Sequence, residues 1–215
     1  PMEVINKGIL NALEMLGLDN KQPQQGSGLL STQPEIFSEF NTKYDPVIAP
    51  RAVGKDTVST AIDRVSSVLG DTNKIVKPLM LYTVNRESKY GTDPNTFKKR
   101  TVKFKNKSGN ISTGTVGHGG VAQVTSNSFR NIVNKLSNAS EKTDAGRVSK
   151  KLETAGLLSG LKRVSEGNNE GIERFLETPF NSVLLGRLQY RINNRALPKN
   201  EQGFKKYYED IYRGR

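Results

Sequence analysis

Apolar residues recur at helical spacing in several separate stretches of this 215-residue chain. Val58, Ile62, Val65 and Leu69 follow one another at steps of four, three and four residues, which predicts one buried helix face. Similar stripes predict further helices over residues 74–86, 126–136, 147–161, 177–192 and 203–212. The chain is therefore predicted to be mainly helical.

Two residues are expected to begin helices, and the chain is expected to fall into two parts. Asp56 is a plausible N-cap for the first stripe, and Thr178 is another, because Pro179 suits a first helical position. Residues 1–50 combine a predicted helix, a Gln/Pro/Gly linker and an extended arm, which suits an anchoring segment. Residues 51–215 are expected to form a single domain.

Residues 101–116 change to the two-residue period of a strand. Val102 and Phe104 alternate with Lys103 and Lys105, and the sequence KSGN that follows is a turn signal. This pattern predicts a small, exposed β-hairpin within the helical domain. The predicted fold class is mainly α, or α+β, with one hairpin.

Composition narrows the chemistry that the chain can carry. Lys and Arg total 33 against 21 acidic residues, a net charge of +12 that favours a polyanionic partner such as nucleic acid or a cell envelope. The absence of cysteine excludes thiolate metal sites, and a single histidine, His118, argues against a histidine-based one. We therefore expect no cofactor. No apolar run approaches the ~20 residues that span a bilayer, so no membrane span is expected.

One acidic residue falls on an apolar stripe. Val76, Met80 and Thr83 lie at steps of four and three residues, and the next step of four reaches Glu87, just before a glycine-containing loop. A carboxyl group beside apolar surface loses solvation in its charged form, which favours the protonated form that a general acid needs. The alternative is that the helix ends there and Glu87 points to water.

Few carboxylates follow Glu87 along the chain. Between Ser88 and Gln123 the only acidic residue is Asp93, and the predicted hairpin contains none. Glycosidases with two working carboxylates place the second one across the scissile bond. If the chain is catalytic, a single-carboxylate mechanism is therefore the simpler expectation.

The stretch GTVGHGGVAQVTSNSF places four glycines ahead of a predicted helix. Glycine lets a ligand approach the backbone closely, but the stretch lacks the Gly-Lys-Ser/Thr of a phosphate loop, and a tight turn is the simpler interpretation. Gln123 lies among small apolar residues, where its amide must bond either backbone groups or a polar ligand such as a sugar. His118 could contact substrate or simply face solvent.

Taken together, these stretches resemble the soluble lytic transglycosylases and goose-type lysozymes. ESKYG at 87–91 is similar to the Glu-Ser that ends a helix in this family, and GGVAQVTSNSF at 119–129 is similar to its Gly-Leu-Met-Gln-like segment. In TPFNSVLLGRLQYRI, Gly186 and Tyr190 fall at the spacing of a later family helix. The family's Ala-Tyr-Asn segment is not evident. The resemblance covers residues 56–212 and implies a lysozyme-like helical domain.

The resemblance implies that Glu87 is the general acid, and later the base, in cleaving the β-1,4 bond between N-acetylmuramic acid and N-acetylglucosamine. In transglycosylases the substrate's own acetamido group and 6-hydroxyl complete the reaction, so no second protein carboxylate is needed. Ser88 would orient Glu87 or contact sugar. The candidate substrate-binding residues are Ser88, Tyr90, His118, Gly120, Val121, Gln123 and Tyr190.

An enzyme of this kind must reach the cell wall. The first residues, PMEVINKGIL, lack the basic-then-apolar pattern of a secretory signal. We therefore expect a phage-encoded protein of the virion, such as a tail protein, that acts in the host periplasm or wall after delivery. Peptidoglycan glycan strands would be its substrate, and other virion proteins would contact residues 1–50.

Two other functions stay open. A DNA-binding protein would use the lysines of the hairpin to follow phosphates. Only Phe104 lies among those lysines, which leaves no stacking platform, so nucleic acid is not favoured as a partner. A structural virion protein with an inactive lysozyme-like fold would share every feature above, and only an activity assay separates it from the enzyme.

Overall fold

The computed structural model describes residues 51–105, 109–193 and 195–213. The helix, linker and arm predicted within residues 1–50 lie outside this range. The described part is mainly helical with one two-stranded antiparallel sheet, which confirms the predicted fold class. None of the helices in it is both long and apolar enough to cross a membrane.

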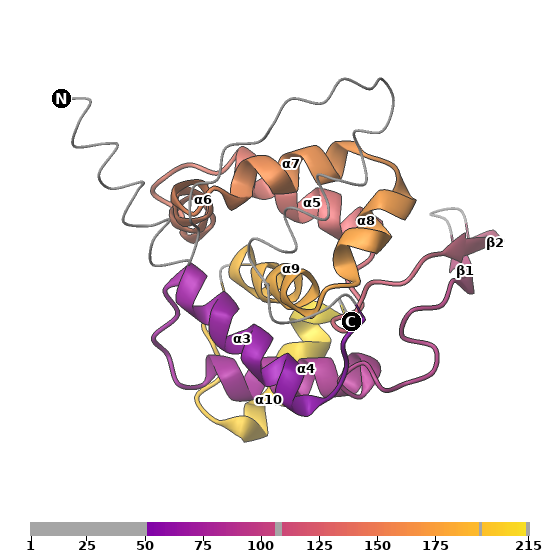
Figure 1. The fold of residues 1–215 in the computed structure, drawn as a ribbon, viewed down its shortest axis with the longest axis horizontal. Helices are drawn as coiled ribbons and strands as arrows, with labels where there is room; N and C mark the ends of the chain where they lie inside the picture. The colour runs from indigo at the N-terminus through magenta and orange to yellow at the C-terminus, as the bar shows by residue number, and fades with distance from the viewer. Residues whose placement is uncertain (1–50, 106–108, 194, 214–215) are drawn as a thin grey trace, which may run out of the picture. The chain divides into compact units, whose positions relative to one another are not determined.

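Helix α9 (Pro179–Arg191) forms the centre of the domain (Figure 1). Helices α3 (Lys55–Leu69) and α4 (Val76–Ser88) lie on one side of it, and the remaining long helices lie on the other. The sequence predicted a single buried stripe on α9, but almost the whole helix is buried. A helix without a polar face is covered on all sides, and here even Asn181, Ser182 and Arg187 are buried.

Four helices cover the second side of α9. They are α5 (Ser126–Ser137), α6 (Asp144–Thr154), α7 (Leu157–Glu166) and α8 (Asn169–Leu176). The side chains of Thr125, Thr143 and Asn168 cap three of these helices by accepting a hydrogen bond from a backbone N–H of the first turn. Helix α8 was not predicted from the sequence, because its eight residues are too few to show a clear helical period.

The two predicted helix starts differ from the structure in detail. The first helix begins at Lys55, with Gly54 rather than Asp56 at the N-cap. Thr178 does occupy the N-cap of α9, but its hydroxyl makes no capping bond and is buried without a hydrogen-bond partner among the described residues. Pro179 at the first position needs no N–H acceptor, which lowers the demand for a side-chain cap.

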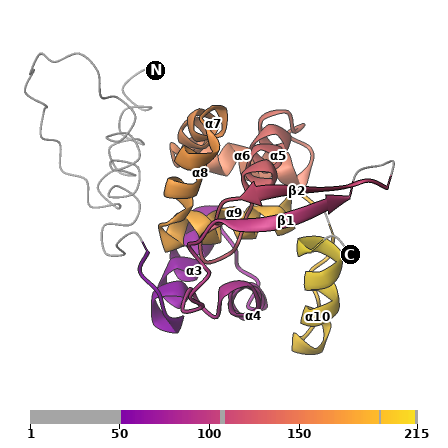
Figure 2. The ribbon, with the colours of Figure 1, turned by 90° about the vertical axis from the view of Figure 1, so that its right-hand side faces the viewer.

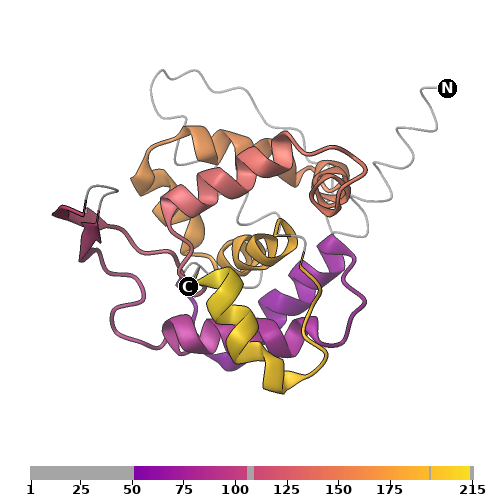
Figure 3. The same ribbon diagram turned by 180° about the vertical axis from the view of Figure 1, so that it is seen from behind.

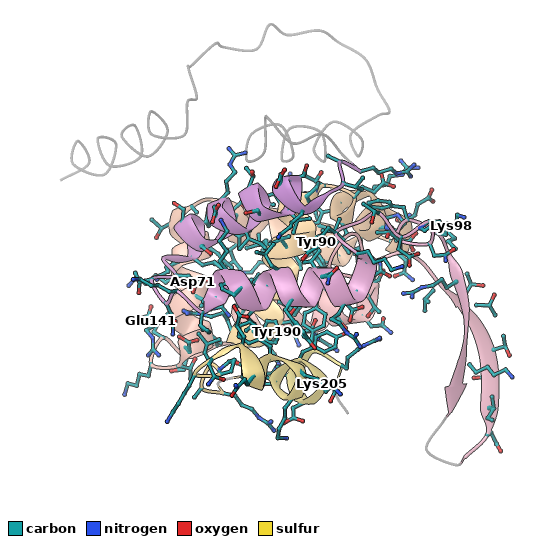
Figure 4. All side chains as sticks on the ribbon, turned by 90° about the horizontal axis from the view of Figure 1, so that it is seen from below. Asp71, Tyr90, Lys98, Glu141, Tyr190 and Lys205 are labelled. Atoms are coloured by element: carbon teal, nitrogen blue, oxygen red, sulfur yellow. The ribbon has the colours of Figure 1, made fainter. Side chains whose placement is uncertain are left out.

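Strands β1 (Arg100–Lys105) and β2 (Ile111–Val116) form the predicted hairpin, with Arg100 opposite Val116 at its base. The hairpin projects from the helical domain (Figure 2), and Lys98 marks the place where it leaves (Figure 4). The side chains of Lys98, Lys99 and Lys103 are exposed. The hairpin therefore presents a basic surface to solvent.

The last helical segment crosses the side of the domain formed by α4 and α9 (Figure 3). It consists of a 3-10 turn (Glu201–Gly203), helix α10 (Phe204–Tyr207) and a π-helical turn, η2 (Tyr208–Tyr212). The Tyr207 ring stacks on Tyr190 of α9 at 5.3 Å. In Figure 4, Tyr190 accordingly lies between α4 and this segment.

A buried group of charges joins the loop after α3 to α9. The Arg187 guanidinium donates through two nitrogens to the Asp71 carboxylate, at 2.8 and 2.9 Å. Both side chains are nearly inaccessible, at 2% and 3% exposure. Arg191 contacts the same carboxylate at 3.3 Å and also pairs with Asp144. The buried positive charge of Arg187 on α9 is therefore balanced by direct contact with a carboxylate.

Candidate active site

Glu87 lies in the last turn of α4, which runs to Ser88, two residues beyond its predicted end. Its side chain is only 8% exposed. The Tyr208 hydroxyl donates a hydrogen bond of 2.5 Å to Oε1, and the Arg213 guanidinium lies 3.4 Å from the same oxygen. Oε2 has no hydrogen-bond partner among the described residues. Glu87 therefore does not simply point to water, because Tyr208 and Arg213 hold Oε1.

The Glu87 carboxylate lines a hollow of about 210 Å³, which we call the Glu87 hollow. Every side chain that lines it is polar or charged: Glu87, Asp93, Asn95, Thr96, Arg100 and Gln123. They come from the end of α4, the loop that follows it, the start of β1 and the glycine-rich turn. Such a lining, rich in donors and acceptors, matches the hydroxyl and amide groups of a sugar.

Gln123 is fully engaged within the protein. Its Nε2 donates to the carbonyl oxygens of Thr96 and Gly120, at 2.9 and 2.7 Å, and its Oε1 accepts from Arg100 at 2.7 Å. The amide thus joins the loop after α4, the hairpin base and the glycine-rich turn. The sequence left two roles for it, and the geometry shows the first: Gln123 bonds backbone groups while it also lines the Glu87 hollow.

Gly120 lets the glycine-rich turn pack directly on α8 and α9. Its φ is +64°, and a Cβ there would lie 2.0 Å from the Leu176 carbonyl oxygen and 2.6 Å from Ser182 Oγ. Ser182 in turn donates to the Gly119 carbonyl and accepts from the Ala122 N–H. Gly120 and Val121 are both buried, so their place in the site is to shape the turn.

Ser88 ties the end of α4 to this turn. It is buried, its hydroxyl lies 2.6 Å from the Val121 carbonyl oxygen, and it accepts from the Gly91 N–H at 2.8 Å. Ser88 does not line the Glu87 hollow in this structure. These contacts join the end of α4 to the glycine-rich turn. The hydroxyl of Ser88 is therefore bonded to backbone groups of the protein.

Backbone strain gathers on the two segments that flank Glu87. Lys89 and Tyr90 have φ values of 51° and 60°, and Gln123 has a φ of 53°. Left-handed conformations cost non-glycine residues energy, and such strain tends to persist at functional sites. The positive angles turn the chain sharply after α4, which sends the following loop along the hollow.

Neither of the two predicted substrate-binding tyrosines lines the Glu87 hollow. Tyr90 does not line it, and its carbonyl accepts from the Gly54 N–H at 2.8 Å. Tyr190 is buried at 1% exposure, and its hydroxyl shares a 2.7 Å hydrogen bond with Thr83. Burial raises the pKa of the Tyr190 phenol, so it stays neutral. Tyr190 packs beneath the segment that carries Tyr208.

His118 is buried rather than exposed in its turn. Its ring packs edge-on against Phe97, and Nε2 lies 3.4 Å from Glu177, which also pairs with Arg51. Nδ1 has no hydrogen-bond partner among the described residues. His118 does not line the Glu87 hollow, and its setting is that of a packed core residue.

Burial lowers the pKa of His118 below its ordinary value of 6.5, against the opposing pull of Glu177 and Glu173. The folded state therefore binds this proton less readily than the unfolded state. Stability should be fully present above pH 6.5 and fall as pH decreases toward the folded pKa. Because His118 is the chain's one histidine, a proton NMR titration of its ring follows it directly. A midpoint at or above 6.5 would contradict the expectation.

Several residues of the site were not found from the sequence. Tyr208 and Arg213 reach Glu87 from more than 120 positions away, and no local pattern links them. Tyr208 does lie in the helix predicted over residues 203–212, and the stripe of that helix was the one available signal. Asp93 was noticed as the lone acid after Glu87, but its place in the same hollow depends on the left-handed turn at Lys89 and Tyr90.

Comparison of the chain with protein-family models, with curated proteins and with solved structures gives no match.

Proposed function

We propose that residues 51–215 form a peptidoglycan-cleaving glycosidase, a lytic transglycosylase or muramidase, in which Glu87 is the general acid. The observation that carries the proposal is the Glu87 carboxylate itself. Its side chain is nearly buried, accepts a hydrogen bond from Tyr208 through Oε1, and lines a hollow whose other side chains are all polar or charged. Backbone strain on both flanking segments supports a functional role for this place.

The geometry suggests how each group would act. A glycan strand in the hollow would receive a proton from Glu87 Oε2 on its glycosidic oxygen, and the carboxylate left behind would then accept a proton in the second step. The Tyr208 hydroxyl, bonded to Oε1, orients the group. Arg213, 3.4 Å from Oε1, compensates the negative charge once the proton has left.

Asp93 gives the mechanism a second possible carboxylate. It lines the same hollow, and its Oδ1 accepts from the Asn95 N–H at 2.8 Å, which fixes its orientation. If Asp93 activates a water molecule, the product is a hydrolysed sugar. If it only positions substrate, the substrate's own groups can close an anhydro ring, as the resemblance implies. We favour the second route, because the Asp93 carboxylate already accepts a backbone hydrogen bond.

Mass analysis of the muropeptides released from purified peptidoglycan tests the proposal. We expect wild-type protein to release disaccharide products that carry an anhydro sugar, and Asp93→Asn to keep that product type. Hydrolysed products that disappear in Asp93→Asn would assign the water-activating role to Asp93. Absence of any released product would contradict the proposal and leave the two alternatives, a DNA-binding protein and an inactive structural virion protein.

The setting that we propose is a phage virion whose protein opens the host wall locally. The net charge of +12 suits an anionic envelope, and the exposed lysines of the hairpin base lie on the projecting part of the domain. The contacts proposed between residues 1–50 and other virion proteins concern a part of the chain outside the described residues.

A further inference from the structure

A second hollow of about 260 Å³ lies where the base of the hairpin meets the starts of α5 and α8. It shares no lining residue with the Glu87 hollow. We call it the α8 hollow; it is lined by Lys99, Thr115, Val116, Gly117, Thr125, Ser126, Asn127, Asn169, Glu170 and Glu173. The proposed cleavage reaction assigns no role to any of these side chains.

Glu173 makes this hollow unusual. Its side chain belongs to the lining, yet the residue is only 7% exposed. It makes no hydrogen bond, and no ion pair within 4.0 Å, with any residue that the structure describes; Lys99 shares the lining but does not reach it. Its oxygens are not among the inaccessible, unpaired side-chain atoms of the described residues, so they open onto the hollow while the rest of the side chain is covered. A donor from outside can therefore reach the carboxylate through the hollow.

The Glu173 carboxylate lies directly beside Gly117. A Cβ placed on Gly117 would lie 1.6 Å from Glu173 Oε1 and 2.5 Å from Oε2, so the missing side chain makes room for the carboxylate. The carboxylate therefore lies against the backbone between hairpin and turn. Since both oxygens lie near Gly117, the group is poorly placed for the two parallel bonds of a guanidinium and better suited to a single donor.

The other side chains of the hollow are mostly acceptors. The oxygens of Thr115, Ser126 and Asn127 take part in no side-chain hydrogen bond with the described residues, whereas Thr125 caps α5. Glu170 adds a second carboxylate but is already paired with Arg174. Nowhere in the described residues do three His, Cys, Asp or Glu side chains cluster as a metal site requires. An ammonium group, with three donors and one charge, matches one free carboxylate and neutral acceptors.

We propose that the α8 hollow binds a primary ammonium group carried on a flexible aliphatic chain, as in a lysine side chain, with Glu173 as its counterion. The hydroxyl and amide oxygens of Thr115, Ser126 and Asn127 accept the remaining N–H groups. This binding site is independent of the proposed glycosidase activity.

Titration of the full chain with Nα-acetyl-lysine N-methylamide, followed by amide NMR, tests the site. The expected result is a saturable shift of the Gly117 and Asn127 amides, with little response to the uncharged norleucine counterpart. Glu173→Gln keeps the shape of the side chain but removes its charge, and should weaken binding about tenfold or more. Glu170→Gln, on the same helix but already paired in the wild type, should bind the probe nearly as the wild type does.

Equal binding of the norleucine probe by wild-type protein would overturn the proposal without any variant. Unchanged binding by a folded Glu173→Gln protein would overturn it as well. Tighter binding of the matching arginine probe would overturn the choice of ammonium. Glu87→Gln should leave probe binding unchanged, so loss of the α8 site and loss of the proposed cleavage are observed separately.

Discussion

Glu87→Gln is expected to lower the release of muropeptides from purified peptidoglycan by about a thousandfold. General acid catalysis by a positioned side chain contributes on the order of 10²–10⁴-fold, and an amide cannot transfer the proton. The glutamine oxygen can still accept the Tyr208 hydrogen bond, so the last turn of α4 and its contact with the C-terminal segment should persist. The loss should therefore appear in the rate and not in the fold.

Glu141→Gln provides the matched control for this experiment. Glu141 is an exposed carboxylate that does not line the Glu87 hollow, and in Figure 4 it lies at the opposite edge of the domain from Lys98. Its replacement makes the same chemical change. Both variants should give amide spectra and unfolding midpoints close to the wild type. Wild-type rates in a well-folded Glu87→Gln protein would remove Glu87 from the mechanism and with it the proposed single-acid chemistry.

Asp71→Ala is expected to cost about 3 to 5 kcal/mol of unfolding free energy, because it leaves the buried Arg187 charge without its partner. For a domain of this size the melting temperature should fall by roughly 6 to 20 °C. Both side chains are nearly inaccessible in the wild type, so the Arg187 charge has little water around it to replace the lost carboxylate. Denaturant unfolding followed by circular dichroism measures the free energy directly.

The ion pair between Lys77 and Asp63 is the natural comparison. Its side chains are 42% and 57% exposed, and such pairs contribute about 0 to 1 kcal/mol, so Asp63→Ala should change stability little. A double substitution, Asp71→Leu with Arg187→Met, removes both buried charges and should recover much of the loss. Equal effects of Asp71→Ala and Asp63→Ala would show that the buried pair adds no more than a surface one.

The sequence predicted most of the helices and the hairpin, because each depends on a local period. The stripe of Val58, Ile62, Val65 and Leu69 lies on the buried face of α3, as expected. The ends of helices were harder to predict. Helix α4 runs past Arg86 to Ser88, where Lys89 forms the C-cap in a left-handed conformation. A lysine in the sequence does not indicate that conformation. The all-round burial of α9 follows from its neighbours, which periodicity within the helix does not reveal.

The candidate site was predicted in outline only. Glu87 and Gln123 do line one hollow, and the resemblance placed both. Ser88, Gly120 and Val121 are buried and do not line it, and His118 and Tyr190 pack elsewhere. Whether a residue lines the hollow depends on the direction in which its side chain points. Backbone angles such as the positive φ values of Tyr90 and Gln123 set that direction, and these angles arise from tertiary packing.

The hydrogen bond between Tyr208 and Glu87 has a consequence for the order in which the domain folds. The two residues are 121 positions apart, so the contact closes a loop that spans most of the domain. Helix α4 can form early from local interactions, whereas the bond to its glutamate must wait until the α9 layer is in place and the final segment docks. A partly folded chain would thus already carry the carboxylate but lack the hydroxyl that orients it. Recovery of function after dilution from denaturant would then lag behind recovery of helix.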